Sequence, residues 1–339
     1  MKQFRAVLRR AIAGEDLGAE ATAEAFGAIM DEQISAVQAA ALLAALATKG
    51  ETVAEIVGAA RAMRERSLHV EHAGDVVDVC GTGGDAAGTI NISTAVAFVL
   101  AGAGVAVAKH GNRAASSQCG SADVLEALGV KIDVPPEQAA RQLAVHRVTF
   151  LFAQHYHPAM RAVGPIRREL GVRTIFNVLG PLTNPAGATR QVIGVAREGW
   201  LPLLAEALAE LGAAAGAVVH ATNGLDEVAG DAPTRIVQFD ASGPKTWVLV
   251  PRDYGVDASV EELRGGDART NAEALLSILR GERSPRADVV CLNAALAFVV
   301  AGRAASIDEG LALARQSIAD GKALQALDGL RGRPQMEFA

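Results

Sequence analysis

The sequence has few aromatic residues, few cysteines and no excess of positive charge, and each shortage excludes a class of protein. Aromatic residues make up 4% of the 339 residues while half of all residues are hydrophobic, so the core must consist mainly of small and aliphatic side chains. The cysteines are Cys80, Cys119 and Cys291, and their wide spacing without a CxxC pair argues against a disulfide scaffold or a zinc ribbon. The formal net charge of −6 argues against a nucleic-acid-binding surface.

A long apolar run is also missing. The longest, residues 94–108, spans 15 residues and contains two glycines, which is short of the roughly 20 residues that cross a bilayer. The N-terminal segment MKQFRAVLRRAIAGEDLG mixes basic and apolar residues at helical spacing, so it predicts an amphipathic helix rather than a signal peptide. We therefore expect no membrane contact and, with unpaired cysteines, a cytoplasmic location.

The first 70 residues carry four segments with apolar residues repeating near every 3.6 positions, and they predict a small all-helical domain. From Asp75 onward the pattern changes to short apolar runs that alternate with helical segments. This alternation predicts a large α/β domain with a mostly parallel central sheet flanked by helices. The expected strands are 76–80, 105–108, 130–133, 148–152, 191–195 and 216–220, and residues 231–285 are expected to contain an antiparallel hairpin.

A glycine-rich loop follows the first expected strand. Residues 81–85 read GTGGD, and the segment NIST at 91–94 then opens an apolar helix, which favours binding of an anion at the helix N-terminus. The loop fits neither common nucleotide fingerprint, because a basic Lys109 stands where a dinucleotide site expects an acid and the lysine of a Walker A loop is absent.

A second, basic loop follows the next strand with the sequence KHGNR at 109–113. We expect Ser121 to cap the helix that comes after it, with Asp123 in the first turn. Both loops lie beyond the carboxyl ends of neighbouring parallel strands, where such sheets bind ligands. Glycines, hydroxyls and cations gathered there indicate a phosphorylated ligand.

An acidic pair, Asp226 and Glu227, follows the strand at 216–220. Two carboxylates in such a loop suit Mg²⁺ when phosphates share the coordination. His155 and His157 could suggest a metal pair, but no third ligand lies near them in the sequence, so we interpret them as structural histidines.

The motifs GTGGD, TINIST, KHGNR, SSxxGSADVLEALG and GLDE, together with HPAMRAVGPIRRELGVRTIFNVLGPLTNP at 157–185, resemble the anthranilate phosphoribosyltransferase family over nearly the whole chain. The resemblance implies transfer of the phosphoribosyl group of phosphoribosyl pyrophosphate (PRPP) to the amine of anthranilate, a step of tryptophan biosynthesis. It also implies a homodimer formed through the helical domain. The implied domains are a helical one of residues 1–70, joined by helices of about 157–185, and an α/β one of 71–156 and 186–339.

The resemblance assigns site residues as well. No protein nucleophile is implied, and the transition state would be stabilised by Lys109 and the metal ligands. Two Mg²⁺ ions are expected with PRPP, held by Ser93, Asp226 and Glu227. Anthranilate is expected at Gly81, His110, Asn112 and Arg167. The residues expected to bind PRPP are Gly81, Gly84, Asp85, Thr89, Asn91, Ile92, Ser93, Thr94, Lys109, His110, Gly111, Asn112, Arg113, Ala114, Ala115, Ser116, Ser117 and Ser121.

Two alternatives stay open at this point. A pyrimidine nucleoside phosphorylase shares the architecture but would use inorganic phosphate and a nucleoside, and the GLDE acids and the Arg167 segment argue against it. A nucleic-acid-binding relative without catalysis should have a strongly basic groove and degraded loops, whereas this chain is acidic and keeps both loops.

Overall fold

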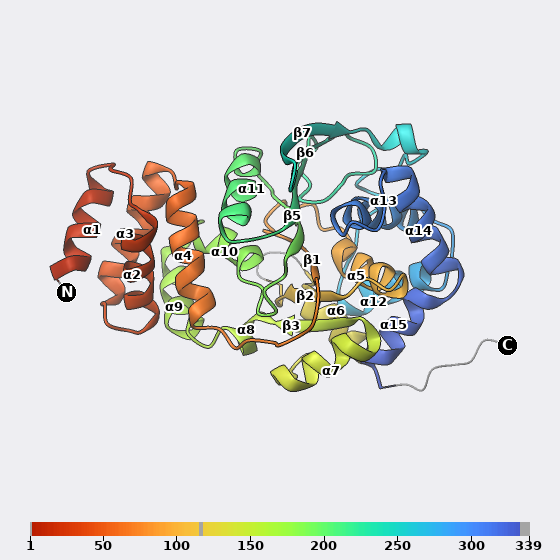
Figure 1. Cartoon of the computed structure of the whole chain (residues 1–339), viewed down its shortest axis with the longest axis horizontal. Helices are drawn as coiled ribbons and strands as arrows, with labels where there is room; N and C mark the ends of the chain where they lie inside the picture. The colour runs from red at the N-terminus through yellow and green to blue at the C-terminus, as the bar shows by residue number, and fades with distance from the viewer. Residues whose placement is uncertain (1, 115–117, 333–339) are drawn as a thin grey trace.

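The computed structural model describes residues 2–114 and 118–332, and it separates a group of helices from a larger body built on one sheet (Figure 1). The third and fourth helices begin at the hydroxyl residues that the sequence offers as caps, Ser35 and Thr52. The Thr52 hydroxyl and the Glu55 carboxylate form a reciprocal capping box at the start of the fourth helix. These helices are α1 (Lys2–Ile12), α2 (Ala19–Met30), α3 (Ala36–Lys49) and α4 (Val53–Glu65).

The large body is organised around a seven-stranded sheet of order β3-β2-β1-β4-β5-β6-β7. The five strands β1 to β5 run parallel, and β6 and β7 add an antiparallel hairpin at one edge, so the predicted fold class is confirmed. The strands are β1 (Val77–Gly81), β2 (Val107–Gly111), β3 (Val148–Phe152), β4 (Arg190–Gly194), β5 (Ala215–Ala221), β6 (Thr234–Asp240) and β7 (Gly243–Leu249).

Helices cover both faces of the sheet because strand residues alternate between the two faces. On β5, Ala217 and Val219 pack with the helices on one face, whereas Val218 joins the core on the other face. The first face carries α5 (Ile92–Gly102), α6 (Ser121–Ala127), α12 (Ala268–Leu279), α13 (Pro285–Val300), α14 (Ile307–Ala319) and α15 (Lys322–Leu330). The helices that lie on the other face of the sheet or lead to it are α7 (Pro136–His146), α8 (Ala153–Tyr156), α9 (Met160–Leu170), α10 (Phe176–Leu182) and α11 (Trp200–Glu210). A short 3-10 turn (Pro251–Tyr254) follows β7.

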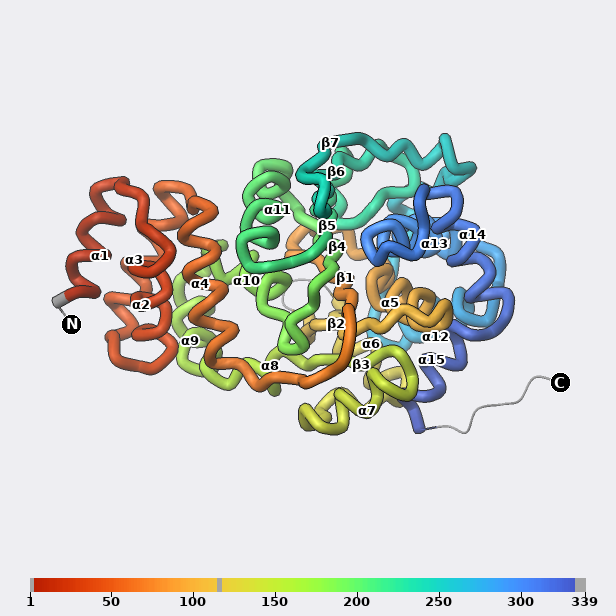
Figure 2. Tube along the Cα trace, viewed as in Figure 1, coloured from red at the N-terminus to blue at the C-terminus, as the bar shows by residue number. Residues whose placement is uncertain are grey.

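The segment 157–185 returns to the N-terminal helices. Figure 2 shows α9 among the N-terminal helices although more than a hundred residues separate it from α2 and α3, and α9 contacts both of these helices. Val163 of α9 and Phe176 of α10 share one core with Phe26 of α2. This shared core fixes the distance between the helical group and the strand ends where the site lies.

One expected strand is wrong. Residues 130–133 pair with no strand in the described part of the chain, and they run as an extended connection into α7. Val130 and Ile132 are buried all the same, because they pack against the core of the first face. An alternating apolar pattern indicates that every second side chain is buried. Here those side chains are buried by packing, without pairing to a strand. No helix in residues 2–114 and 118–332 is long and apolar enough to cross a membrane.

Candidate active site

A cleft of about 1180 Å³ opens between α9 and α10 and the carboxyl ends of β1 and β2. Parallel strands place their following loops at one edge of a sheet, so this is where ligands are expected. The residues that line it include Gly81, His110, Asn112, Arg113, Phe152, Gln154, His157, Arg161, Arg167, Arg168, Phe176 and Gly180.

The glycine loop after β1 is held close to other parts of the chain. Gly83 and Gly84 have φ values of 66° and 84°, which glycine adopts without strain. A Cβ at Gly84 would collide with the guanidinium of Arg173, and a Cβ at Gly81 would collide with the carboxylate of Asp226. The positive φ values therefore favour glycine at positions 83 and 84, whereas a side chain at position 81 would have to displace the Asp226 carboxylate.

The N-terminus of α5 differs from the open anion site that the sequence suggests. The N–H groups of Ile92 and Thr94 donate to backbone carbonyls, and that of Ser93 donates to Glu227 Oε1 at 3.3 Å. The Asn91 side chain does not cap the helix but donates to Cys119 O at 3.1 Å, which links the two loops. Asp85 and Thr89 lie in the preceding loop, where Asp85 Oδ1 accepts from Ala87 N at 3.2 Å.

Lys109 lies in the middle of β2 with its ammonium group almost fully buried. The residue is 4% exposed, and its Nζ donates to Val79 O at 2.7 Å and to Ser93 Oγ at 3.2 Å. Among the described residues it forms no ion pair with a carboxylate. The cation thus lies between both loops with its charge only partly compensated, which suits a phosphate group.

Asp226 and Glu227 face the two ends of the first loop. Asp226 Oδ2 accepts from Gly83 N at 2.8 Å, just as Glu227 accepts from Ser93 N. Burial and the nearby Asp85 carboxylate raise the pKa of Asp226 to about 7, and burial and Asp226 raise that of Glu227 to about 8. Neither carboxylate has an ion-pair partner within residues 2–114 and 118–332.

These two acids fit a divalent cation. Mg²⁺ prefers oxygen ligands, and neither acid forms an ion pair within the described residues. Ser93, the third expected ligand, contacts Glu227 through its backbone N–H. The described residues contain no group of three or more His, Cys, Asp or Glu that would enclose a metal by themselves. An ion here would therefore take further ligands from phosphate oxygens and water, as Mg²⁺ commonly does.

Two buried histidines meet in the cleft. His110 Nδ1 lies 3.0 Å from Gly180 O, so it donates to that carbonyl, and the two Nε2 atoms of His110 and His157 lie 3.2 Å apart. Burial lowers the pKa of His110 to about 4 and that of His157 to about 3, so both rings are neutral at pH 7. His155 instead binds Asp133 at 2.7 Å, and neither His155 nor His157 belongs to a metal cluster in the described residues.

Arg167 of α9 contributes a guanidinium without a counter-ion. It lies partly buried with its Cζ 5.9 Å from the centre of the Phe176 ring, and burial lowers its pKa. In the described part of the chain it makes no ion pair. A planar fork of this kind on the cleft wall suits a carboxylate ligand.

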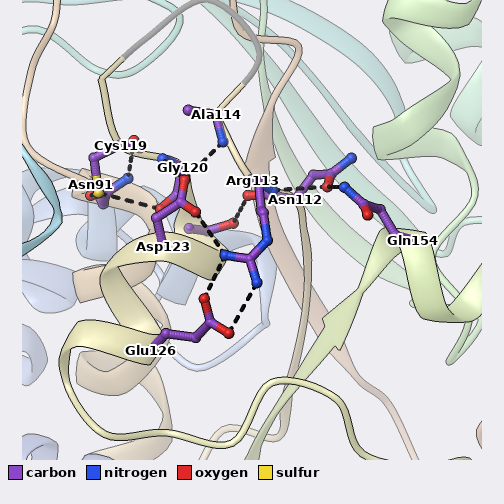
Figure 3. A network of polar contacts seen from close by, with 10 residues as sticks. Asn91, Asn112, Arg113, Ala114, Cys119, Gly120, Asp123, Glu126 and Gln154 are labelled. Atoms are coloured by element: carbon purple, nitrogen blue, oxygen red, sulfur yellow. Dashed lines mark hydrogen bonds and ion pairs between the residues drawn. The ribbon is translucent and has the colours of Figure 1, made fainter. Parts of the chain in front are cut away.

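The basic loop after β2 is tied to its surroundings (Figure 3). Asn112 Oδ1 accepts from Arg113 N at 2.8 Å and from Gln154 Nε2 at 3.2 Å, which leaves its Nδ2 as a donor. Arg113 pairs with Asp123 and Glu126 of α6. Of the other expected residues, Gly111 is the last residue of β2 and Ala114 lies in the loop, while Ala115, Ser116 and Ser117 lie outside the described residues.

The expected cap of α6 is wrong. Gly120 is the N-cap residue and Ser121 is the first residue of the helix, with its Oγ donating to Asn112 O at 3.3 Å. Gly120 takes this position because its N–H donates to the Asp123 carboxylate at 2.9 Å.

Comparison with known proteins places the chain in a family. Models of a glycosyl transferase family match it twice, the helical bundle domain over residues 5–67 and the a/b domain over residues 73–324. An anthranilate phosphoribosyltransferase of Rubrobacter xylanophilus is 50% identical over 327 residues, which cover 96% of each chain. The chain belongs to the anthranilate phosphoribosyltransferase family.

Solved structures agree with this assignment. The anthranilate phosphoribosyltransferase of Thermus thermophilus has a TM-score of 0.91 with 46% identity, covering 96% of this chain and 98% of that one. The enzyme of Saccharomyces cerevisiae in complex with PRPP and Mg has a TM-score of 0.90 with 26% identity, covering 98% of this chain and 97% of that one.

Three residues that the sequence analysis left out complete the environment of the predicted site in this family member. Fully buried Asp78 accepts from His110 N at 3.2 Å and from Asn184 Nδ2 at 2.7 Å, and burial raises its pKa. Arg173 donates to Gly83 O at 3.3 Å, and Gln154 contacts Asn112. The only sequence signal that could have indicated a role for Asp78 was an acidic residue inside an apolar strand. The contacts of Arg173 and Gln154 depend on the tertiary fold and have no such signal.

Proposed function

We propose that this chain transfers the phosphoribosyl group of PRPP to the amine of anthranilate, giving N-(5-phosphoribosyl)anthranilate and pyrophosphate in tryptophan biosynthesis. The observation that carries the proposal is a set of charged groups without full partners at the cleft and at the glycine loop beside it. Arg167 lines the cleft, Asp226 and Glu227 contact the glycine loop, and Lys109 contacts Ser93 at the end of that loop. Their signs match a phosphate, a bound cation and a carboxylate. The family assignment favours this reaction over nucleoside phosphorolysis.

The reaction requires charge stabilisation rather than a protein nucleophile. The amine attacks C1 of the ribose as the C1–oxygen bond to pyrophosphate breaks, and the amine proton passes to solvent or to the leaving group. Mg²⁺ held by Asp226, Glu227 and Ser93 would neutralise the negative charge of the leaving pyrophosphate. Lys109 adds a fixed positive charge beside the same loop, in a buried position where such a charge acts strongly.

Anthranilate would lie on the other wall of the cleft. The guanidinium of Arg167 can donate hydrogen bonds to the carboxylate of anthranilate. The Nδ2 of Asn112 can donate to the same carboxylate or to the ring substituents. His110 and Gly81 border this space, and the neutral His110 ring presents a surface that an aromatic ring can contact. We assign to PRPP the remaining loop residues named in the sequence analysis, except Arg113, whose guanidinium Asp123 and Glu126 already hold.

We further propose two Mg²⁺ ions. Asp226 and Glu227 contact different parts of the loop, at Gly83 and Ser93, which suits one ion near each carboxylate. We also propose that residues 1–70 with about 157–185 form one helical domain and that 71–156 and 186–339 form the α/β domain, since α9 packs on α2 and α3. The cytoplasmic location stays a prediction.

The activity itself gives the first test. Anthranilate fluorescence should fall only when PRPP and Mg²⁺ are both present, and thymidine or uridine with phosphate should give no free base. The control is the same mixture without Mg²⁺. Phosphorolysis of a nucleoside without anthranilate turnover would overturn the proposal.

A second prediction concerns assembly. We propose a homodimer through the helical domain, because Ile12 and Val37 at the surface of this domain are 66% and 79% exposed although both are apolar. Light scattering should give about twice the 34.9 kDa chain mass at micromolar concentration. Val37→Glu should shift the equilibrium toward monomer, whereas Val145→Glu, at an apolar residue of α7 that is 67% exposed, should not. A stable wild-type monomer would contradict the prediction.

A further inference from the structure

The two arms of the basic loop touch where they leave β2 and enter α6. A Cβ at Gly120 would collide with backbone atoms of Asn112, Arg113 and Ala114, so the arms are in direct contact there. Ala122 N donates to Asn112 O at 3.2 Å across the same junction. We call residues 112–114 and 120–122 the neck of the loop.

A single carboxylate holds both arms of the neck. Asp123 Oδ2 accepts from Ala114 N and from Gly120 N, each at 2.9 Å, and Asp123 Oδ1 accepts from Arg113 Nη1 at 3.0 Å. Although partial burial raises the pKa of Asp123, these donors outweigh it and the pKa is lowered. The side chain is therefore ionised at pH 7 and bonded to three donors.

Glu126, one turn further along α6, holds the guanidinium of Arg113 by its two terminal nitrogens. Arg113 also lies 5.5 Å from the centre of the Phe152 ring. Figure 3 shows the guanidinium between the two acids rather than free at the end of an extended side chain. Two carboxylates and an aromatic ring thus already contact the Arg113 guanidinium, which the loop sequence alone would predict to bind phosphate.

We propose that Asp123 and Glu126 are positioning residues for PRPP, and that Arg113 is the strut through which Glu126 acts rather than a phosphate ligand; the inference rests on the proposed function. The ion pair between Arg113 and Glu126 holds the two arms of the neck in place. The neck in turn sets the direction of the chain after Lys109 and Asn112. PRPP then finds the loop donors already in place, which lowers the ordering cost of binding.

The opposite role for Arg113 makes an opposite prediction. If Arg113 left Glu126 to bind a phosphate, Glu126 would compete with PRPP, and neutralising Glu126 would tighten PRPP binding. If Arg113 is a strut, neutralising Glu126 loosens the neck and weakens PRPP binding. The sign of the effect of Glu126→Gln therefore separates the two roles.

The experiment is calorimetric titration of the full-length protein with PRPP in Mg²⁺, followed by steady-state kinetics. Because Arg113 and Glu126 are 42% and 44% exposed, Glu126→Gln should weaken PRPP binding by about two- to fivefold. Asp123→Ala removes backbone contacts as well and should weaken it by about ten- to a hundredfold, with Asp123→Asn in between. The KM for anthranilate and the kcat at saturating PRPP should change less than twofold.

A matched control is Asp257→Asn, which breaks the exposed ion pair with Arg252 far from the cleft. It should leave the Kd for PRPP unchanged. A double-mutant cycle of Arg113→Ala and Glu126→Ala, measured as PRPP affinity, should be non-additive, because the partners act together in the bound state.

Tighter or unchanged PRPP binding in Glu126→Gln, or strict additivity in the cycle, would overturn the inference. Should Asp123→Ala fail to fold, the exposed Glu126→Gln substitution still decides the sign. Failure of the wild type to bind PRPP would instead remove the proposed function, and the inference with it.

Discussion

Replacing Asp226 with Asn and Glu227 with Gln is expected to raise the Mg²⁺ concentration for half-maximal turnover at least about tenfold, or to abolish turnover, since each lost charged ligand costs about 1.5–3 kcal/mol. Both carboxylates lie beside the glycine loop and form no ion pair in the described residues, although the Lys109 charge acts on Glu227. Pyrophosphate beside two uncompensated carboxylates would be repelled, so a cation between them is required. The measurement is a Mg²⁺ titration of turnover at saturating anthranilate.

The fold should survive this double substitution. The amides can still accept from Gly83 N and Ser93 N, and circular dichroism of the variant should match that of the wild type. A surface pair without a role, Asp257→Asn with Glu261→Gln, is the matched control and should titrate like the wild type. If the titration of the Asp226 and Glu227 variant coincided with these curves, magnesium would have to be held elsewhere.

Arg167→Ala is expected to raise the KM for anthranilate by about ten- to a hundredfold, because a charge-assisted hydrogen bond contributes about 1.5–3 kcal/mol. The guanidinium stands on the cleft wall with no carboxylate partner in the described chain, so its removal leaves no buried charge unpaired. The Kd for PRPP should stay within about twofold of the wild type, because Lys109 is bonded to Val79 O and Ser93 Oγ and does not line the part of the cleft where Arg167 lies.

Arg167→Lys provides the graded comparison. Lysine keeps the charge but loses the planar fork, so its KM for anthranilate should fall between those of the wild type and Arg167→Ala. Kinetics with each substrate varied in turn measure both effects. Loss of PRPP affinity with an unchanged KM for anthranilate would show that Arg167 binds PRPP and would contradict its assignment to anthranilate.

Local patterns predicted most of the fold. The strand that ends at Gly81, the glycine loop and the helix after it follow one another in the chain, and sequence-local signals determine each of them. The strand expected at 130–133 failed because alternation reports burial, while pairing depends on which strand is beside it, and β3 occupies the edge next to β2. A pattern within a few residues cannot contain that information.

The candidate site, like the fold, could be predicted from the sequence only in part. Its residue types were evident from the loops, but the partners that determine their roles were not. Arg113 is basic in the sequence, yet acids 10 and 13 positions later hold its guanidinium. Ser93 N–H belongs to a helix start that favours anions, and Glu227, 134 positions away, accepts its hydrogen bond. Such pairings are properties of the tertiary fold.

The most direct test of the central claim is identification of the products by mass spectrometry after incubation of the pure protein with PRPP, anthranilate and Mg²⁺. The account predicts N-(5-phosphoribosyl)anthranilate and pyrophosphate in equal amounts, with neither formed when Mg²⁺ is chelated. Pyrophosphate released without the anthranilate adduct, or ribose 1-phosphate formed from a nucleoside and phosphate while anthranilate is untouched, would contradict it.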